Sequence, residues 1–591
     1  MSRAVRIANC SGFYGDRLSA AREMVEGGPI DVLTGDYLAE LTMLILAKAQ
    51  AKDPAGGYAR TFLTQLEQVL GTCLDHGIRV VANAGGLNPA GLAAAVRALA
   101  ARLGLPARVA HVEGDDLRAD LSAITPPVTG KPVSANAYLG AWGIAAALGA
   151  GADVVVTGRV TDASLVVGPA AWWHGWGPSD WDALAGAVVA GHVVECGAQA
   201  TGGNYAFLHE IPDLRLPGFP VAEIAADGSS VITKHPGTGG LVSVGTVTAQ
   251  LLYEIAGPAY LGPDVTAHFD TIALAQEGPD RVAVSGVRGS PPPETLKVAL
   301  TELGGFRNTV TLVLTGLDVE AKATRAETML VDVLGGRDRF AEVDVRLLRF
   351  DRPDAPTNEQ ATAHLRITVK DPDPTKVGRA FSNAAVELAL SGYAGFHATS
   401  PPGPESAYGV YRPAAVPRDA VRHVAVLPGG ERRTIPDPPT GGPAGPAPTG
   451  TAEGSAHTGA PVRAGAQSQG ETVTVPLGRV CGARSGDKGG DANVGLWARD
   501  DAGYAWMRGY LTVERLRGLL GPEAADLEIE RFELPNLRAL NVVVHGLLGE
   551  GVAASTRPDP QAKGLGEYLR SRVVEVPGAL AAGADGTSGR S

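Results

Sequence analysis

The chain has 591 residues, of which 45% are hydrophobic and 19% charged, and its formal net charge is −12. This apolar content excludes a chain that is disordered throughout, and the length corresponds to three or four domain-sized units. The negative charge argues against nucleic acid as a partner, because no surplus of Lys and Arg is present to neutralise phosphates. No apolar run reaches the roughly 18–20 residues of a membrane span, so no membrane association is expected.

The N-terminal residues and the cysteines predict a soluble cytoplasmic protein. The first residues lead directly into an apolar strand, without the apolar stretch and cleavage site of a secretory signal. A disulfide framework is not expected, because the chain is long, contains no CxxC motif and has only four cysteines: Cys10, Cys73, Cys196 and Cys481.

Residues 1–203 alternate short β-branched runs with Ala-rich or amphipathic segments, separated by turns that contain glycine. Near-continuous apolar strands that alternate with helices are typical of a parallel sheet covered by helices on both faces. The predicted fold class is therefore α/β. The expected strands are 5–9, 30–34, 79–83, 108–113 and 153–157, and the expected helices are 37–51, 57–76, 89–103 and 137–148.

Residues 204–427 lose this regular alternation and are predicted to form an α+β continuation, so that residues 1–427 make up one large N-terminal domain. The expected elements are strands 310–314, 343–350 and 364–369 and helix 376–390.

Composition changes sharply over residues 428–470, where Pro, Gly, Ser, Ala and Thr dominate. Such a segment buries little apolar surface to offset its ordering entropy, which predicts a flexible linker. Residues 471–577 regain regular patterning and are predicted to form a small α+β domain of ordinary size. Residues 578–591 are predicted to be a disordered tail.

Polar residues follow the expected strands of the N-terminal sheet. Ligands of open parallel sheets bind beyond the carboxyl ends of the strands, so these residues are candidates for the rim of a site. The alternative is that they are the ordinary residues of turns and helix N-caps. The residues expected to bind substrate here are Asn9, Ser11, Asn83, Asn88 and Arg159, beside the carboxylates Asp36, Glu40, Asp115 and Asp162.

Within this rim, Arg159 is the natural partner of a carboxylate or phosphate, although an ion pair with Asp162 or Asp36 is the alternative. Asp36 and Glu40 are spaced i, i+4 and are candidates for acid and base, unless Asp36 is only an N-cap. Cys10 follows the first strand and is a candidate nucleophile if a helix N-terminus lowers the pKa of its thiol; the alternative is an inert buried cysteine.

His192, Glu195 and Cys196 lie on one face of an expected helix, 181–198, and all three side chain types can bind zinc. One helix rarely supplies a whole metal site, and no HExxH or paired CxxC motif is present, so no metal is predicted.

Gly237, Thr238 and Gly239 precede an expected apolar helix, 241–255. A glycine-rich turn at a helix N-terminus binds anions, so these residues are candidate substrate ligands; the alternative is a structural turn. The turn is neither a Walker A motif nor a complete GxGxxG.

The most distinctive string is 482–495, with five glycines among several charged side chains. It is predicted to be a loop that closes over the site, or else a hydrogen-bonded turn that docks on the N-terminal region. Its candidate substrate-binding residues are Arg484, Asp487, Lys488 and Asn493.

This string resembles the signature of the acyclic terpene utilisation protein family, and so do the strings 9–16, 34–40, 83–89 and 157–162. The resemblance implies a large N-terminal domain joined to a small C-terminal domain of ferredoxin-like fold. It also implies a role in the breakdown of branched acyclic terpenoid acids as coenzyme A thioesters, beside biotin-dependent acyl-CoA carboxylases. The long linker departs from the family pattern.

Two hypotheses follow. The first is a catabolic enzyme that acts on a branched acyl-CoA or its free carboxylate, as a hydrolase, lyase or hydratase. Its candidate catalytic groups are Asp36, Glu40, Cys10 and Asp162. No cofactor is expected beyond the coenzyme A of the substrate. The second is a non-catalytic partner or scaffold of an acyl-CoA carboxylase. A homo-oligomer is expected.

Overall fold

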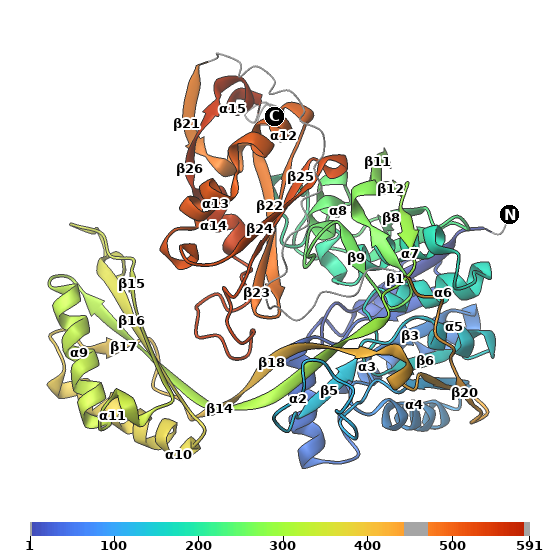
Figure 1. The fold of residues 1–591 in the computed structure, drawn as a ribbon, viewed down its shortest axis with the longest axis horizontal. Coiled ribbons are helices and arrows are strands. Elements are labelled where there is room, and N and C mark those ends of the chain that lie inside the picture. The colour runs from blue at the N-terminus through green and yellow to red at the C-terminus, as the bar shows by residue number, and fades with distance from the viewer. Residues whose placement is uncertain (1–2, 442–470, 584–591) are drawn as a thin grey trace. The chain divides into compact units, whose positions relative to one another are not determined.

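The computed structural model describes residues 3–441 and 471–583, and the chain divides into two compact units. Unit 1 consists of Met1–Thr301, Tyr411–Val552 and Gln561–Ser591, and unit 2 consists of Glu302–Val410 and Ala553–Pro560. Unit 1 contains the predicted parallel sheet, drawn in blue and green in Figure 1, and the C-terminal domain, drawn in orange and red.

The centre of unit 1 is a parallel sheet of the five strands predicted from the sequence. They occur in the order β1 (Val5–Asn9), β2 (Val32–Gly35), β3 (Arg79–Ala82), β6 (Val154–Thr157) and β4 (Val109–Glu113). Antiparallel strands at both edges extend this sheet to eleven strands. Beside β1 lie β7 (Pro220–Ile224), β8 (Ser230–Lys234), β12 (Arg281–Ser285) and β11 (Ala273–Gly278), and beside β4 lie β19 (Val424–Val426) and β20 (Arg432–Thr434).

Helices cover both faces of this sheet, as the apolar strands require. One core joins alternate strand residues such as Ile7 and Val155 to α5 (Trp142–Gly149), α6 (Ser164–His174) and α7 (Trp181–Val194). The other core lies on the opposite face and contains Leu33 and Val80. Its helices are α1 (Ala20–Glu26), α3 (Arg60–His76) and α4 (Pro89–Leu103). The α/β prediction is confirmed.

Three segments differ from their predictions. The expected helix 137–148 is divided into β5 (Ser134–Ala137), which pairs with β14 (Thr295–Thr315), and α5. The expected helix 241–255 is only α8 (Val244–Leu251), capped by Ser243. Regular structure extends into the first part of the predicted linker, where β20 is the last strand of the main sheet and Ile435 is buried. The rest of that linker, 442–470, lies outside the described residues.

The C-terminal domain is an α+β fold of the predicted ferredoxin-like kind. Its sheet has the order β22 (Cys481–Lys488), β23 (Asp491–Ala498), β25 (Ala539–Val544) and β24 (Ile529–Leu534). The helices are α12 (Asp501–Tyr510), α13 (Val513–Leu520) and α14 (Leu565–Ser571), and β21 (Thr472–Pro476) pairs with β26 (Val573–Pro577). The predicted tail begins with α15 (Gly578–Gly583), and residues 584–591 lie outside the described residues.

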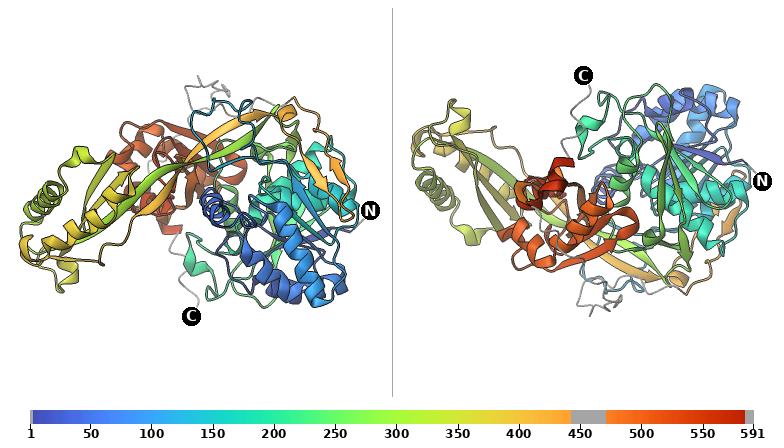
Figure 2. Two further views of the ribbon diagram at one scale, coloured as in Figure 1. Left: turned by 90° about the horizontal axis from the view of Figure 1, so that it is seen from below. Right: turned by 90° about the horizontal axis from the view of Figure 1, so that it is seen from above.

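The glycine-rich string 482–495 forms most of a β-hairpin, β22–β23, and is therefore not the loop that its composition suggests. Two of its glycines have a packing role. A Cβ at Gly486 would overlap the ring of Tyr253, and a Cβ at Gly495 would overlap Leu252. The hairpin can therefore lie directly against the segment that follows α8, and Figure 2 shows the C-terminal domain from two further directions.

Unit 2 has an antiparallel sheet with helices on one face. The strands occur in the order β15 (Glu342–Arg349), β16 (Thr362–Asp371), β14 and β17 (His397–Ala398), and β18 (Ser406–Pro417) also pairs with β14. The helices are α9 (Val319–Val333), α10 (Pro374–Val377) and α11 (Arg379–Ser391). The predicted strands and the predicted helix of this region are present, in an α+β arrangement.

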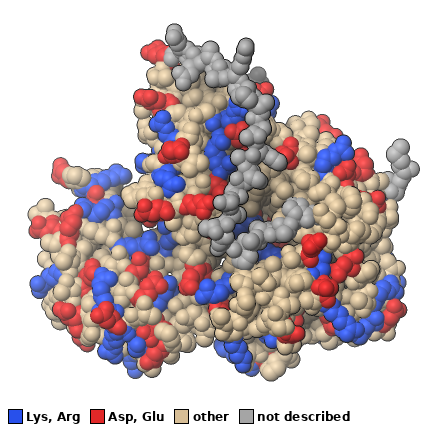
Figure 3. All heavy atoms as spheres, in the orientation of Figure 1, with Lys and Arg blue, Asp and Glu red and all other residues tan. Residues whose placement is uncertain are grey.

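Charged side chains of both signs are interspersed on the face of the molecule shown in Figure 3, and among the described residues there no extended basic surface is visible. Within residues 3–441 and 471–583, no helix has the length and apolar character needed to cross a bilayer.

Candidate functional site

The ends of the parallel strands carry a hydrogen-bonded framework. Asn9, at the end of β1, donates from Nδ2 to the carbonyl oxygens of Val194 (2.7 Å) and Glu195 (3.0 Å). Asn83, after β3, donates to Asp36 Oδ1 at 2.6 Å. These buried amides hold the end of α7 and the segment after β2 in place.

Asp36 is not on a helix with Glu40. Helix α2 (Glu40–Lys52) begins at Glu40 with Ala39 at its N-cap, and Asp36 lies in the extended segment before it. The predicted i, i+4 pair on one helical face is therefore wrong, and so is the N-cap alternative for Asp36. Burial raises the pKa of Asp36 well above its ordinary value, and the Asp162 carboxylate raises it further.

Arg159 follows β6 and binds inside the protein rather than standing free. Its Nη1 lies 2.9 Å from the carbonyl oxygen of Leu38 and 3.0 Å from Asp162 Oδ1, and its guanidinium lies 4.3 Å from the centre of the Tyr138 ring. The ion-pair alternative of the sequence analysis is thus correct for Asp162. A guanidinium has five N–H donors, so it can keep these contacts and still donate to a ligand carboxylate.

The end of α7 contributes His192 and Glu195 to the same region. The His192 ring is 1% exposed, and its Nδ1 lies 3.1 Å from Glu195 Oε1. Burial, followed by the Lys488 ammonium, lowers the pKa of His192 to about 4, so the ring is neutral near pH 7. Burial raises the pKa of Glu195 well above its ordinary value, and Asp162 and Glu254 add to this effect.

The described residues contain no group of three His, Cys, Asp or Glu side chains placed to hold a metal ion. Burial also raises the pKa of the Cys196 thiol well above its ordinary value.

Lys297 of β14 and Tyr411 of β18 lie in the same region, because Lys297 Nζ is 4.7 Å from the centre of the Tyr138 ring and Tyr411 packs in a cluster with Tyr138. Burial lowers the pKa of the Lys297 ammonium, but Tyr138, Tyr411 and Glu40 raise it, and the net shift is upward. The pKa of Glu40 is raised by burial, against the opposing effect of Lys297. The Lys297 ammonium and the Glu40 carboxylate thus influence each other's pKa.

The hairpin β22–β23 completes the site from the C-terminal domain. Lys488 donates from Nζ to the carbonyl oxygen of Glu254 at 2.7 Å, and Asn493 Oδ1 accepts from the Glu254 N–H at 2.8 Å. Burial and then the Lys297 ammonium lower the pKa of Lys488 to about 8. Burial and then the Glu254 carboxylate raise the pKa of Asp487 to about 7.

Solvent reaches several of these side chains. The side chains of Asp162, Glu254 and Lys563 are 31%, 39% and 37% exposed. The charged cluster is thus enclosed enough to shift pKa values, while solvent reaches part of it.

We call this group the acid–lysine cluster. Its carboxyl groups are Asp36, Glu40, Asp162, Glu195, Glu254 and Asp487, and its cations are Arg159, Lys297, Lys488 and Lys563. Groups whose pKa values are displaced toward neutrality, as those of Asp487 and Lys488 are, can both take up and release protons at physiological pH.

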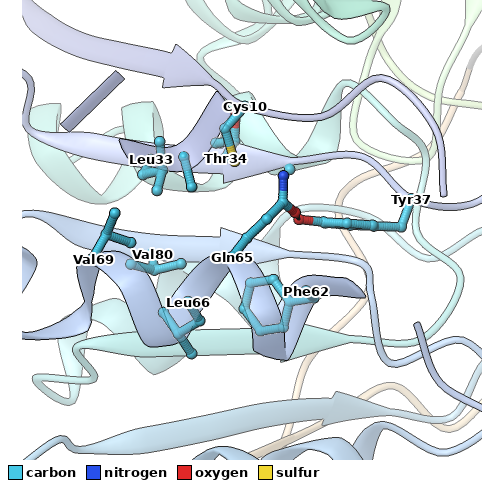
Figure 4. A pocket seen from close by; sticks show the side chains of 11 residues that line it. Cys10, Leu33, Thr34, Tyr37, Phe62, Gln65, Leu66, Val69 and Val80 are labelled. Atoms are coloured by element: carbon cyan, nitrogen blue, oxygen red, sulfur yellow. Dashed lines mark hydrogen bonds between the residues drawn. The ribbon is translucent and has the colours of Figure 1, made fainter. Parts of the chain in front are cut away.

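Cys10 is not part of this cluster. Its thiol lines a small apolar cavity with Leu33, Phe62 and Leu66, and it lies in the buried core (Figure 4). Burial raises the pKa of the Cys10 thiol, so the thiolate that a nucleophile needs is disfavoured. The burial of Cys10 argues against a nucleophile and agrees with the alternative of a buried cysteine.

Two other candidate ligands have structural partners. Ser11 Oγ donates to the carbonyl oxygen of Phe13. Asn88 caps α4 by accepting from Gly91 N–H at 2.9 Å and donates to the loop carbonyls of Ala55 and Gly56. Asn88 is thus a helix N-cap, which is the alternative given in the sequence analysis.

The turn at Gly237, Thr238 and Gly239 does not lead into a helix N-terminus, because α8 begins five residues after Gly239. The next two N–H groups bond to the carbonyls of Asp213 and Thr201, and Lys234 Nζ donates to the carbonyl oxygen of Thr238 at 2.8 Å. The prediction of an anion cradle is wrong, and the structural turn is correct.

Arg484 lies beside the cluster, with its guanidinium 4.5 Å from the centre of the Tyr253 ring. Sequence reasoning missed Glu254, Lys297 and Tyr411, and it considered Glu195 only as a metal ligand. Glu254 and Lys297 lie in segments without a motif. Their positions depend on β14 and on the turn after α8, which pattern analysis does not place.

Comparison with known proteins agrees with this arrangement. The model of the acyclic terpene utilisation family protein AtuA matches residues 5–427. The chain belongs to this family. The AtuA ferredoxin-like domain matches residues 475–575, so the family's two parts correspond to the parallel-sheet region and to the domain that supplies Lys488. No curated protein sequence matches the chain. The family has a role in acyclic terpene utilisation, which fits a catabolic protein.

Proposed function

We propose that the protein is an enzyme that acts on a branched acyl-CoA or its free carboxylate by acid–base chemistry, as a hydratase or lyase. The observation that carries this proposal is the acid–lysine cluster. It combines carboxyl groups of raised pKa with a lysine whose pKa is lowered to about 8, and both family domains contribute to it.

The residues of the cluster suit the steps of such a reaction. Arg159 and Lys297 supply positive charge for a carboxylate or for an enolate oxygen that develops at a thioester carbonyl. A carboxyl group that still holds its proton near pH 7, such as Asp487, can donate it to carbon or to a leaving hydroxyl. An ionised carboxylate accepts a proton in the opposite step.

Thiol-based hydrolysis has less support. The pKa values of both Cys10 and Cys196 are raised by burial, so neither thiol is activated as a nucleophile. The proposal therefore favours proton transfer over covalent catalysis by cysteine.

The test is turnover of a panel of branched acyl-CoAs and their free acids by the purified protein, with mass spectrometry of the products. We expect a product that differs from its substrate by one water or by a cleaved carbon–carbon bond. Arg159→Ala should raise KM by about 10- to 100-fold, because a charge-assisted contact to the substrate anion is lost. If no compound were converted and the protein bound an acyl-CoA carboxylase subunit instead, the scaffold hypothesis would replace the enzyme.

A further inference from the structure

Glu254 adopts a backbone conformation that is unfavourable for its residue type. It lies two residues beyond the C-cap of α8 with φ of 57°, in the left-handed region that favours glycine. Non-glycine residues in this region are uncommon, and they persist only where the surrounding structure holds them.

The C-terminal domain provides that restraint. Asn493 accepts from the Glu254 N–H at 2.8 Å, and Lys488 donates to the Glu254 carbonyl oxygen at 2.7 Å. Asn493 and Asn541 also donate to the carbonyl oxygen of Ile255, at 3.1 and 3.2 Å. Side chains from two strands of the C-terminal domain, the buried Asn493 and the half-buried Lys488, therefore bind both the N–H and the carbonyl oxygen of Glu254.

The side chain of Glu254 lies among other carboxyl groups of the cluster. Its carboxylate is one of the charges that raise the pKa values of Asp162, Glu195 and Asp487 after burial has raised them. The Lys563 ammonium lies 3.7 Å from Glu254 Oε1, a contact that solvent weakens because both side chains are more than a third exposed. With 39% exposure, Glu254 reaches solvent more than Asp162 (31%), Asp487 (15%) or Glu195 (10%).

We propose that Glu254 is the catalytic base of the reaction, and that Asn493 and Lys488 are positioning residues that hold its strained backbone. The inference rests on the proposed function. In a hydration, the Glu254 carboxylate takes a proton from water, and the water oxygen bonds to the β-carbon of an unsaturated acyl group. The electron pair of the double bond moves to the α-carbon, which takes the proton of a neighbouring carboxylic acid such as Asp487. One water is added in total.

The decisive experiment compares Glu254→Gly, Glu254→Gln and Glu254→Ala with the parent full-length protein. The measurements are thermal unfolding without ligand, and kcat and KM on the acyl-CoA that the parent converts best. We expect Glu254→Gly to have the highest melting temperature, because it relieves both the backbone strain and the charge repulsion. The Gln and Ala variants relieve only the repulsion and should melt between Gly and the parent. All three should lose at least 100-fold in kcat.

Asp318→Gly is the matched control, because Asp318 is an exposed residue of unit 2 with φ of 58° and no capping hydrogen bond from its side chain. It should raise the melting temperature and leave turnover unchanged. Asn493→Ala should lower kcat with little change in KM, and this loss should vanish in the Glu254→Gln background, because the two residues act as a unit.

Outcomes separate this inference from the proposed function. An active parent whose Glu254→Gln variant keeps its turnover would overturn the role of Glu254 and leave the enzyme assignment standing. Glu254→Gly and Glu254→Gln variants that both melt below the parent would show a structural role and overturn the inference too. A parent that converts no acyl-CoA or free acid would overturn both.

Discussion

The ends of the parallel strands and the hairpin β22–β23 both carry polar residues that the sequence marks as candidates, yet they use them differently. At the strand ends, Asn9, Asn83 and Asn88 direct their side chains to backbone or carboxyl groups of the same domain. On the hairpin, Lys488 and Asn493 direct theirs across to the segment that follows α8. The asparagines at the strand ends form a hydrogen-bonded framework, and the hairpin adds a charged side chain to it.

The electrostatics follow the same division. Burial raises the pKa of Asp36, a carboxyl group enclosed by its own domain, well above its ordinary value. Asp487 and Lys488, where the two domains meet within unit 1, have pKa values of about 7 and about 8. These two pKa values lie near neutrality because each group is desolvated and lies near a like charge from another segment, Glu254 for Asp487 and Lys297 for Lys488.

Among the variants that test this difference, a substitution of Lys488 is expected to have the largest effect on turnover. Lys488→Met removes a cation of the site and the hydrogen bond to Glu254, so kcat should fall by about 10²- to 10⁴-fold. Measured kcat and KM on the best acyl-CoA check this. Asn88→Ala, at a strand end outside the cluster, should lose about 1 kcal/mol of stability and keep its kcat. Equal losses of kcat in both variants would contradict the view that Lys488 belongs to the site and Asn88 only to the framework.

The pH dependence of turnover sharpens the comparison further. Asp487 donates a proton only while it is protonated, and Lys488 carries charge only below its pKa, so the rate should fall as pH rises through about 7 to 8. In Asp487→Asn the limb near pH 7 should disappear, the limb near pH 8 should remain, and the rate should be about 10²-fold lower. A pH–rate profile of both proteins decides this, and an unchanged profile would count against Asp487.

Packing of the hairpin gives a stability test. The Cβ of Gly495→Ala would overlap Leu252, so this variant should lose about 1–3 kcal/mol of unfolding free energy and also displace the hairpin. Gly509→Ala, in helix α12 with open space around the added methyl group, should be stabilised by up to about 1 kcal/mol. Urea unfolding measures both, and a neutral Gly495→Ala would mean that the hairpin does not need close contact.

The smallest expected effect concerns His545, which lies outside the cluster. Its Nδ1 is 3.0 Å from Asp491 Oδ2 and its Nε2 is 3.1 Å from Glu530 Oε2. Burial lowers the pKa of His545, but Asp491 and Glu530 raise it above its ordinary value. The stabilisation is therefore complete below about pH 6.5 and lost as pH rises through the folded-state pKa.

Because the pair is partly exposed, the change should stay below about 1 kcal/mol. Urea midpoints of the parent and of His545→Gln should differ more at pH 6 than at pH 9, with the parent the more stable at pH 6. A stability difference in favour of the parent that grows at pH 9 would contradict the assigned sign.

Local pattern was enough to predict much of the fold. The strand at 5–9 and the helix at 89–103 occur with the predicted bounds, because continuous apolar runs and a Pro–Gly-bounded amphipathic segment are strong local signals. Helix 137–148 was predicted wrongly, because an Ala-rich run hid the short strand β5, whose pairing with β14 is a long-range contact. The glycine-rich string was likewise taken for a loop, because its glycines serve contact with Tyr253 and Leu252 rather than turns.

For the site, the residue types at the strand ends and the string 482–495 could be recognised from the sequence alone, because their side chain chemistry and spacing are local properties. Asp36, Arg159, Asp162, Asp487 and Lys488 were all identified in that way. The sequence could not show that Arg159 pairs with Asp162, that Cys10 is enclosed in the core, or that Lys297 and Glu254 join the cluster. These properties depend on burial and on charges brought together over hundreds of residues, and only the folded chain decides them.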